Sequence, residues 1–284
     1  MTRQHHDDTD RQSPRPDGAG EGFARAKRSL GQNFLCDPNT AAKIVDACRI
    51  APGDTVLEIG PGRGALTGFL AAAAPGALLA LEKDRDLAVR LARDHPGLGV
   101  ALIDALRLDW RRLDRLPGTV RIIGNLPYNI ASPLLWDLCA GATRFARGTF
   151  MIQHEVALRL CAGPGGRDYG ALSAWIASHV RVEYCFKVPP TVFRPRPRVD
   201  SAVVAVTPLP VGERPREPEA FARLLKILFS KRRKQLGGIL KPYRDAALEA
   251  WLAGEGIALT DRPENLSPGQ LSRLAEYLKM GLPS

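Results

Sequence analysis

The stretch GNLPYNIASPLL, residues 124–135, places an amide, a rigid proline and an aromatic ring where the apolar run TVRIIG ends. The side-chain oxygen of Asn125 and a backbone carbonyl, that of Leu126 or Pro127, can accept both N–H groups of an aromatic amine, and the proline ring restricts the direction of the backbone. Such bonds favour a more tetrahedral and more nucleophilic nitrogen. Tyr128 offers a flat surface for an extruded base, worth ~1–3 kcal/mol. The plain alternative is an Asn-x-Pro turn with a packed tyrosine.

A glycine-rich segment, VLEIGPGRGALT, lies between an apolar run and helix-like text and contains Gly60, Gly62 and Gly64. Glycines let the backbone approach a ligand closely, and the start of a helix offers free N–H groups. Glu82, at the end of the next expected strand, can accept both hydroxyls of an adenosine ribose. Gly60, Gly62 and Ala65 also satisfy the dinucleotide pattern, so NAD binding and a structural turn without a ligand are the alternatives.

Two features favour S-adenosylmethionine over NAD. Asp104 ends the third expected strand, where a carboxylate can accept the adenine amino group, and hydride transfer has no use for the Asn-Leu-Pro-Tyr sequence. A sulfonium methyl group is already activated, so catalysis needs positioning and electrostatic preorganisation rather than a strong base. We accordingly find no Ser-His-Asp or paired-carboxylate arrangement in the sequence and predict no metal site.

These residues need a scaffold that brings strand ends together. Expected strands alternate with expected helices, and Asp37 or Asn39 lies near the start of the first helix, with Pro38 in its first turn. The alternation predicts an α/β fold with a parallel, doubly wound sheet over residues 23–208. After the linker PLPVGERPREPE the text has only helical periodicity, which predicts a small all-helical domain over 209–284. The expected strands are TVLEIG, ALLALEK, VALID, TVRIIGN and TFMIQ, and the expected helices include DPNTAAKIVDACRI, ALTGFLAAAA and DRDLAVRLARDH.

Composition limits the classes of function. The chain has 284 residues and a formal net charge of +10, and its first 22 residues are polar and Gly/Pro-rich, which predicts a disordered tail. A basic folded body favours a polyanionic partner such as RNA. No apolar stretch is long enough for a membrane span and no apolar signal core is visible, so a cytoplasmic protein is expected. The five cysteines show no zinc or redox spacing and are expected to be reduced.

The motifs occur in the order seen in the ribosomal RNA adenine N6-dimethyltransferases, which the chain resembles from about Arg25 to its end. The resemblance implies a Rossmann-like class I methyltransferase domain, with S-adenosylmethionine as methyl donor, followed by a helical rRNA-binding domain. Within the family, the sequence looks most like the small-subunit branch, which dimethylates two adjacent adenines near the 3′ end of 16S rRNA. The segments that carry the resemblance are KRSLGQNFL, VLEIGPGRGALT, LEKDRDL, IDAL, GNLPYNIASPLL, MIQHEVALRL, VPPTVFRPRPRVDSAVV, FSKRRKQL and RPENLSPGQLSRLA.

The resemblance also implies roles for single residues. Asn33 and Leu35, with Gln32 beside them, would cover the cofactor; Gly60 would contact its methionine part, Glu82 its ribose and Asp104 its adenine. Asn125 would lie between cofactor and target base, and Tyr128 would stack on that base. Phe193 of VFRPRP would flank the base from the other side, with a core aromatic as the alternative. The family often has a hydrophobic residue where this chain has Lys83.

Basic residues in two segments are predicted to contact rRNA phosphates. Arg194, Arg196 and Arg198 alternate with prolines, and Lys231, Arg232, Arg233 and Lys234 form a cluster after an amphipathic helix; Lys27 and Arg28 would add to them. Such contacts supply affinity and salt dependence rather than base choice. The alternative is a solvated cluster that favourably ends a helix.

The expected function is dimethylation of 16S rRNA in the small ribosomal subunit or its precursor, by a monomer. Two alternatives remain at this point. One is a large-subunit rRNA adenine dimethylase of the antibiotic-resistance type, which shares the Q-N-F-L and N-x-P-Y motifs. The other is a small-subunit assembly factor for which methylation is secondary, as the basic body and helical domain would allow.

Overall fold

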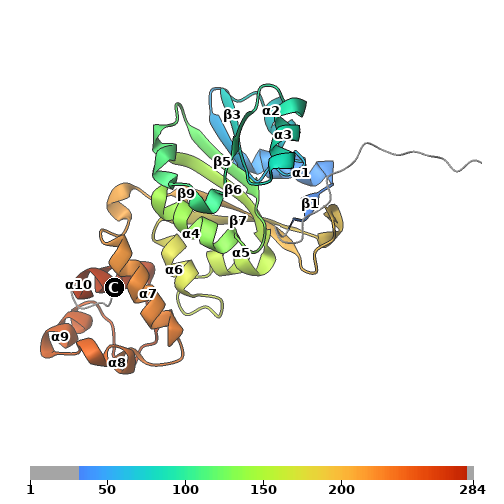
Figure 1. The fold of residues 1–284 in the computed structure, drawn as a ribbon. Coiled ribbons are helices and arrows are strands. Elements are labelled where there is room, and N and C mark those ends of the chain that lie inside the picture. Colours follow the sequence, from blue (N-terminus) through green and yellow to red (C-terminus); the bar gives the residue numbers. More distant parts are fainter. Residues whose placement is uncertain (1–31, 280–284) are drawn as a thin grey trace, which may run out of the picture.

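The computed structural model describes residues 32–279 and contains a seven-stranded sheet with helices on both faces (Figure 1). The strand order is β4-β3-β2-β5-β6-β9-β7, and β1 and β8 form a separate two-stranded pair. The predicted α/β class is confirmed. The strands are β1 (Phe34–Leu35), β2 (Thr55–Ile59), β3 (Ala77–Glu82), β4 (Gly99–Leu102), β5 (Val120–Asn125), β6 (Phe145–Gln153), β7 (Val180–Val188), β8 (Phe193–Arg194) and β9 (Ser201–Pro208).

The sheet is mixed, which corrects the prediction of a parallel sheet. Strands β4, β3, β2, β5 and β6 run parallel, whereas β9 is antiparallel to both of its neighbours, β6 and β7. Parallel neighbours need a crossover connection, usually a helix. The connection from β7 to β9 holds only the short helix η4 and β8, so the chain returns beside β7 in the opposite direction.

Helices α1 to α3 cover one face of the sheet and α4 to α6 the other (Figure 1). Each face has its own apolar cluster: Ile44 and Leu70 belong to one, and Leu134 and Leu138 to the other. The helix after the glycine segment begins at Thr67, later than the text ALTGFLAAAA indicated. The helices are α1 (Pro38–Cys48), α2 (Thr67–Ala72), α3 (Arg85–Asp94), α4 (Ala131–Gly141), α5 (His154–Cys161) and α6 (Ala171–Ala177), with short 3-10 helices η2 (Ala105–Arg107), η3 (Trp110–Arg115) and η4 (Pro190–Val192).

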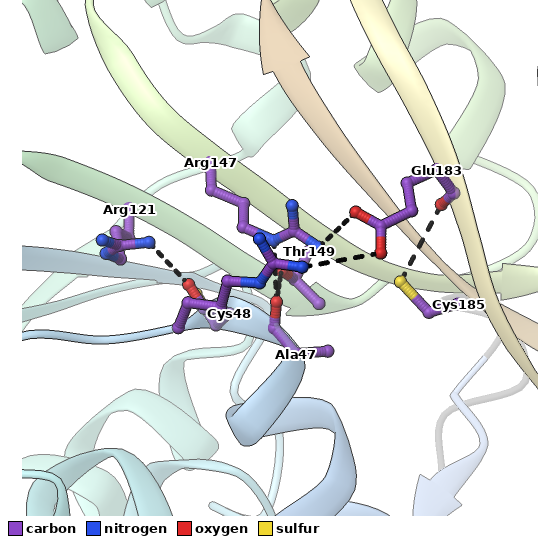
Figure 2. A network of polar contacts seen from close by, with 8 residues as sticks. Ala47, Cys48, Arg121, Arg147, Thr149, Glu183 and Cys185 are labelled. Atoms are coloured by element: carbon purple, nitrogen blue, oxygen red, sulfur yellow. Dashed lines mark hydrogen bonds and ion pairs between the residues drawn. The ribbon is translucent and has the colours of Figure 1, made fainter.

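Helix α1 is held at both ends. At its start the Asp37 carboxylate accepts the Thr40 N–H at 2.8 Å, so Asp37 rather than Asn39 is the cap. At its end two arginines from the sheet reach its last carbonyls (Figure 2): Arg121 donates to Cys48 and Arg147 to Ala47, each at 2.8 Å. Since the last carbonyls of a helix have no partner within the helix, these bonds fix α1 against β5 and β6.

Arg147 is itself held by a carboxylate on strand β7. Arg147 is buried and donates to the Glu183 carboxylate on β7 at 2.8 Å (Figure 2). That pair lowers the pKa of Glu183, chiefly through the hydrogen bond. A buried cation with carbonyl and carboxylate partners is satisfied and rigid, so the position of α1 is set by polar contacts as well as by packing.

After β9 the described residues, up to 279, form helices and no strand, as predicted. Trp175 of α6 stacks on Phe221 of α7 with ring centroids 5.6 Å apart, and one apolar cluster runs through both parts of the chain. The division at residue 209 therefore stays a prediction, and the predicted tail, 1–22, lies outside the described residues. The elements are η5 (Val211–Glu213), α7 (Pro218–Ser230), α8 (Leu236–Ile239), η6 (Lys241–Tyr243), α9 (Ala246–Gly254), η7 (Pro263–Asn265) and α10 (Pro268–Leu278).

Two smaller expectations can be compared with the structure. All five cysteines are free, and burial raises the pKa of the Cys48 thiol to about 11 and that of Cys139 to about 12, so both are poor nucleophiles. Within residues 32–279, no helix combines the length and the apolar character that crossing a membrane would need.

The junction between the two parts predicts an acid-sensitive stability. His179 is buried beside Trp175, and burial lowers the pKa of its imidazole to about 4. Between pH ~6.5 and pH 4 the unfolded chain therefore takes up a proton that the folded chain does not, and stability falls as pH decreases through this window by up to roughly 3 kcal/mol. Urea unfolding at pH 7.5 and pH 5 should show a smaller loss in His179→Asn, which keeps a donor for the Trp175 carbonyl. An equal loss in both proteins would contradict this.

Candidate active site

A pocket lies at the carboxyl ends of the parallel strands, at the point where the strand order reverses. From β2 the chain proceeds to β3 and β4 on one side, and it then returns to β5 and β6 on the other. Crevices at such switch points are the usual ligand sites of open α/β sheets. The pocket lining includes all six predicted cofactor-binding residues and the predicted catalytic loop: Asn33, Leu35, Gly60, Glu82, Asp104, Asn125, Pro127 and Tyr128.

The glycine segment between β2 and α2 has a conformation that requires its glycines. Gly60, Gly62 and Gly64 have φ values of 64°, 60° and 83°, a region that L side chains rarely adopt. A Cβ on Gly62 would also lie 3.2 Å from the ring of Phe34. The Gly62 N–H donates to the Glu82 carboxylate at 3.1 Å, so the loop is tied to the end of β3.

Glu82 has less free capacity than the sequence indicated. Its side chain is buried, and besides Gly62 it accepts the N–H groups of Lys83 and Asp84, both at 2.8 Å. A carboxylate has about four acceptor positions. With three used, roughly one remains, on Oε2, and contact of Glu82 with a ribose stays a prediction.

Asp104 lies just beyond β4 and caps η2, its carboxylate accepting the Leu106 N–H at 3.1 Å. The Lys83 ammonium lies 2.8 Å from its other oxygen, and this hydrogen bond is the main cause that lowers the pKa of Asp104. Lys83 is therefore more than a tolerated departure from the family pattern, because it pairs with the predicted adenine acceptor. Both side chains are partly exposed, so the pair is weak and can open.

The end of β5 orients the predicted catalytic amide. The Asn125 side-chain N–H donates to the Asn33 backbone carbonyl at 3.3 Å, which leaves the side-chain oxygen as an acceptor for the pocket. The Pro127 carbonyl accepts the N–H groups of Ile130 and Ala131 at the start of α4. Of the two backbone acceptors that the sequence left open, the Leu126 carbonyl is therefore the one that remains for a substrate.

Tyr128 is half-buried at the pocket wall, and its hydroxyl lies 2.7 Å from the hydroxyl of Ser201 on β9. Burial raises the pKa of the phenol. Because both ends of the side chain are held, the ring has one preferred orientation, as a stacking surface requires. Its role in stacking stays a prediction.

Phe193 does not face the pocket. Its side chain is fully buried in the cluster that contains α1, and its backbone pairs with Leu35 in the β1–β8 ladder. In this conformation Phe193 cannot flank a base; the alternative, a core aromatic, describes it. The sequence could not separate these two because an aromatic next to a Pro-rich turn fits both.

The predicted RNA-binding residues divide into two groups. Arg194 and Arg196 are exposed, and Arg194 is paired in register with Phe34 of the pocket lining. Lys231, Arg233 and Lys234 are exposed in the turn after α7, whereas Arg232 forms an ion pair with Glu264 and is used within the chain. Lys27 and Arg28 lie outside the described residues.

Sequence reasoning missed Glu58, a buried carboxyl in the pocket lining. It accepts the Thr67 hydroxyl at 2.7 Å, and burial, with the nearby Glu82 carboxylate, raises its pKa to about 7. A charged residue inside the apolar strand VLEIG was the signal that could have identified it. Ser201 was also missed, because a serine within VDSAVV carries no comparable signal.

A family model described as ribosomal RNA adenine dimethylase matches residues 23–280. The chain belongs to the ribosomal RNA adenine dimethylase family. The match of this adenine dimethylase model extends over the sheet, the pocket and the helices after β9, so both parts of the chain are typical of the family.

Individual relatives of this adenine dimethylase agree with that assignment. A "Ribosomal RNA small subunit methyltransferase A" of Maridesulfovibrio salexigens is 52% identical over 92% of this chain and 98% of its own length. A solved dimethyladenosine transferase from Plasmodium falciparum has a TM-score of 0.71 at 26% identity, covering 88% of this chain and 98% of that one. The solved 23S rRNA methyltransferase ErmE has a TM-score of 0.64 at 26% identity, covering 87% and 100%.

The raised pKa of Glu58 predicts a pH-dependent stability of opposite sign to that of His179. The folded state favours the protonated carboxyl, so ionisation costs stability as pH rises from about 4.5 to about 7. Glu58→Gln keeps an acceptor for Thr67 and should be more stable than the native chain by up to about 3 kcal/mol at pH 8, with a difference that shrinks toward pH 5. Urea unfolding across this range measures it, with the exposed Glu219→Gln as a matched control. A pH-independent difference would reject the prediction.

The Tyr128–Ser201 bond predicts coupled effects on methyl transfer. If the bond holds the ring in its stacking orientation, Ser201→Ala and Tyr128→Phe remove the same interaction. Each should slow transfer roughly five-fold, about the worth of one hydrogen bond, and the double variant should lose no more than either single one. If the fold losses of the two single variants multiply in the double variant, the two hydroxyls act independently.

Proposed function

We propose that this chain transfers methyl groups from S-adenosylmethionine to N6 of two adjacent adenines near the 3′ end of 16S rRNA in the small ribosomal subunit. The observation that carries the proposal is the Asn125 amide, oriented by the Asn33 carbonyl, beside the Tyr128 ring at the edge of the glycine pocket. The 52% sequence identity to a small-subunit rRNA methyltransferase supports small-subunit rRNA as the substrate.

The residues present fit the cofactor. Glycines at positive φ leave room beside β2, a buried carboxylate with one free acceptor position lies at the end of β3, and Asp104 lies beyond β4. When bound, S-adenosylmethionine supplies a methyl group that its sulfonium already activates. Gly60 would contact the methionine part and Glu82 a ribose hydroxyl. Asp104 would accept the adenine amino group after its ion pair with Lys83 opens.

On the substrate side, the chain supplies acceptors and a surface. The Asn125 oxygen and the Leu126 carbonyl accept the two N–H groups of the adenine amine, which raises the electron density on its nitrogen. Tyr128 stacks against the flipped ring. Hydrogen bonds already hold this loop: the Asn125 amide bonds to Asn33, the Tyr128 hydroxyl to Ser201, and the Pro127 carbonyl, next to Leu126, to the start of α4. Preorganisation of this kind lowers the barrier without a general base.

Affinity for the particle comes from exposed cations outside the pocket. Arg194 pairs with β1, Arg196 is exposed two residues later, and Lys231, Arg233 and Lys234 follow α7. Contacts with phosphates through these residues make binding salt-dependent and independent of sequence. We further propose that the protein acts as a cytoplasmic monomer on the subunit or its precursor.

A second candidate is dimethylation of large-subunit rRNA. The fold similarity to ErmE favours it. The sequence identity to ErmE is 26%, however, whereas the identity to the small-subunit relative is 52%. Mapping the modified nucleotide by mass spectrometry separates the two, because each predicts a different rRNA.

The proposal predicts methyl transfer that depends on Asn125. Small-subunit particles without the adenine marks should accept labelled methyl groups from S-adenosylmethionine at two adjacent adenines. Asn125→Ala should slow transfer roughly 100- to 1,000-fold, since it removes a preorganised hydrogen-bonding group. Asn39→Ala, an exposed change on α1, is the control. Full activity of Asn125→Ala would reject the mechanism, and label on another nucleotide would reject the proposed substrate.

A further inference from the structure

The loop between α5 and α6, residues 162–170, joins the methyltransferase part of the chain to the helical part. Its Gly165 N–H donates to the Glu264 backbone carbonyl at 2.7 Å. The buried Tyr169 hydroxyl donates to the Leu266 carbonyl at 3.0 Å, and its ring meets Phe229 of α7 edge-on. In Figure 1 this loop extends from the end of α5 toward α7. The two parts are therefore connected by directional bonds as well as by apolar packing.

Arg232 is the centre of this connection. Its guanidinium forms an ion pair with the Glu264 carboxylate and also donates to the carbonyls of Arg167, at 2.8 Å, and Gly166, at 3.3 Å. The side chains of Arg232 and Glu264 are only 35% and 24% exposed. One planar cation thus holds three acceptors from two distant segments of the chain, a geometry that lysine could not reproduce.

The neighbours of Arg232 have a different environment. Lys231, Arg233 and Lys234 are exposed, and the turn that carries them begins where α7 ends at Ser230. Because Glu264 neutralises the charge of Arg232, that residue adds little to the field that attracts phosphates. The cluster therefore contains three cations available to RNA and one that is engaged within the protein.

The position of the three exposed cations relative to the pocket matters for binding. Two contact regions on one rRNA strengthen each other only when the protein holds them at the spacing that the rRNA presents. Apolar packing such as that of Trp175 on Phe221 tolerates small sliding movements, whereas hydrogen bonds depend strongly on direction. The contacts of Arg232 are thus suited to set the spacing between cluster and pocket.

We propose that Arg232, Glu264 and the α5–α6 loop form a latch that fixes the helical part relative to the pocket. Arg232 is then a positioning residue and not an RNA ligand. The RNA contacts of the segment belong to Lys231, Arg233 and Lys234. This inference deepens the proposed function and rests on it for the identity of the RNA, while the latch itself is a contact within the protein.

The test compares variants that separate a latch from an RNA contact. Glu264→Gln removes a negative charge, so it would leave or increase particle affinity if Arg232 bound phosphates. A latch predicts the opposite, a loss of roughly ten-fold, because the two contact regions no longer match one rRNA. Tyr169→Phe is uncharged and fully buried, and it should weaken particle binding in the same direction. Glu249→Gln, whose partner Arg244 lies in the helical part, is the matched control and should behave as the native chain does.

Hydrogen exchange and cofactor affinity are measured on each variant in addition to particle binding. Hydrogen exchange followed by mass spectrometry reports the loop directly, since the Gly165 N–H is one of its bonds. Faster exchange over residues 163–167 is expected in Arg232→Gln, Glu264→Gln and Tyr169→Phe but not in Arg233→Gln. Arg233→Gln should instead weaken particle binding and reduce its salt slope by about 1. Cofactor affinity and exchange in β2 and β5 should stay unchanged in all four variants, which shows that the fold is intact.

The outcomes are distinct. Unchanged or tighter particle binding by Glu264→Gln, together with weaker binding by Arg232→Gln, would overturn the latch and make Arg232 an RNA ligand. Unchanged exchange in the loop would overturn it as well. If the native chain methylates no adenine but the exchange results are as expected, the proposed function fails while the contact between the α5–α6 loop and the helices after β9 stands.

Discussion

The hydrogen bond from the Asn125 side chain to the Asn33 carbonyl brings together two segments that are far apart in the chain and meet at one corner of the pocket. It decides which atom of the amide faces the substrate, so the chemistry of the site depends on where Asn33 lies. That position is set in turn by the pairing of β1 with β8 and by α1, which begins directly after β1. Because Arg121 and Arg147 hold the end of α1, contacts far from the pocket help to position Asn33 and with it the Asn125 amide.

Two buried carboxyls in the pocket lining show how environment sets the role of a side chain. Glu82 accepts hydrogen bonds from three backbone N–H groups. Glu58, one strand away, has one hydroxyl partner and a buried environment, and its pKa rises to about 7. Two glutamates in one pocket lining thus have different surroundings: Glu82 is tied into the backbone at the end of β3, and Glu58 lies buried in β2 with a single hydroxyl partner.

The helical part is attached to the sheet by a continuous core and by a polar network at its rim. Trp175 and Phe221 continue the apolar cluster from α6 into α7, and the network of Arg232 and Glu264 lies at the edge of that contact. Four consecutive basic residues thus take two different roles, since one turns inward to the α5–α6 loop. Under the proposal that the three exposed cations contact rRNA, a rigid joint serves binding at two places better than one further positive charge would.

The sequence by itself determined most elements, the glycine loop and the set of residues around the pocket, because these depend on local periodicity, glycine conformation and motifs at strand ends. It could not determine which acceptors and cations are already in use. The Pro127 carbonyl is used by α4, Phe193 is enclosed by α1, Arg232 is paired with Glu264, and β9 runs antiparallel after a connection without a long helix. Each of these facts rests on a partner far away in the chain or on the path between strands. Local patterns carry no information about such partners, so only the tertiary structure decides them.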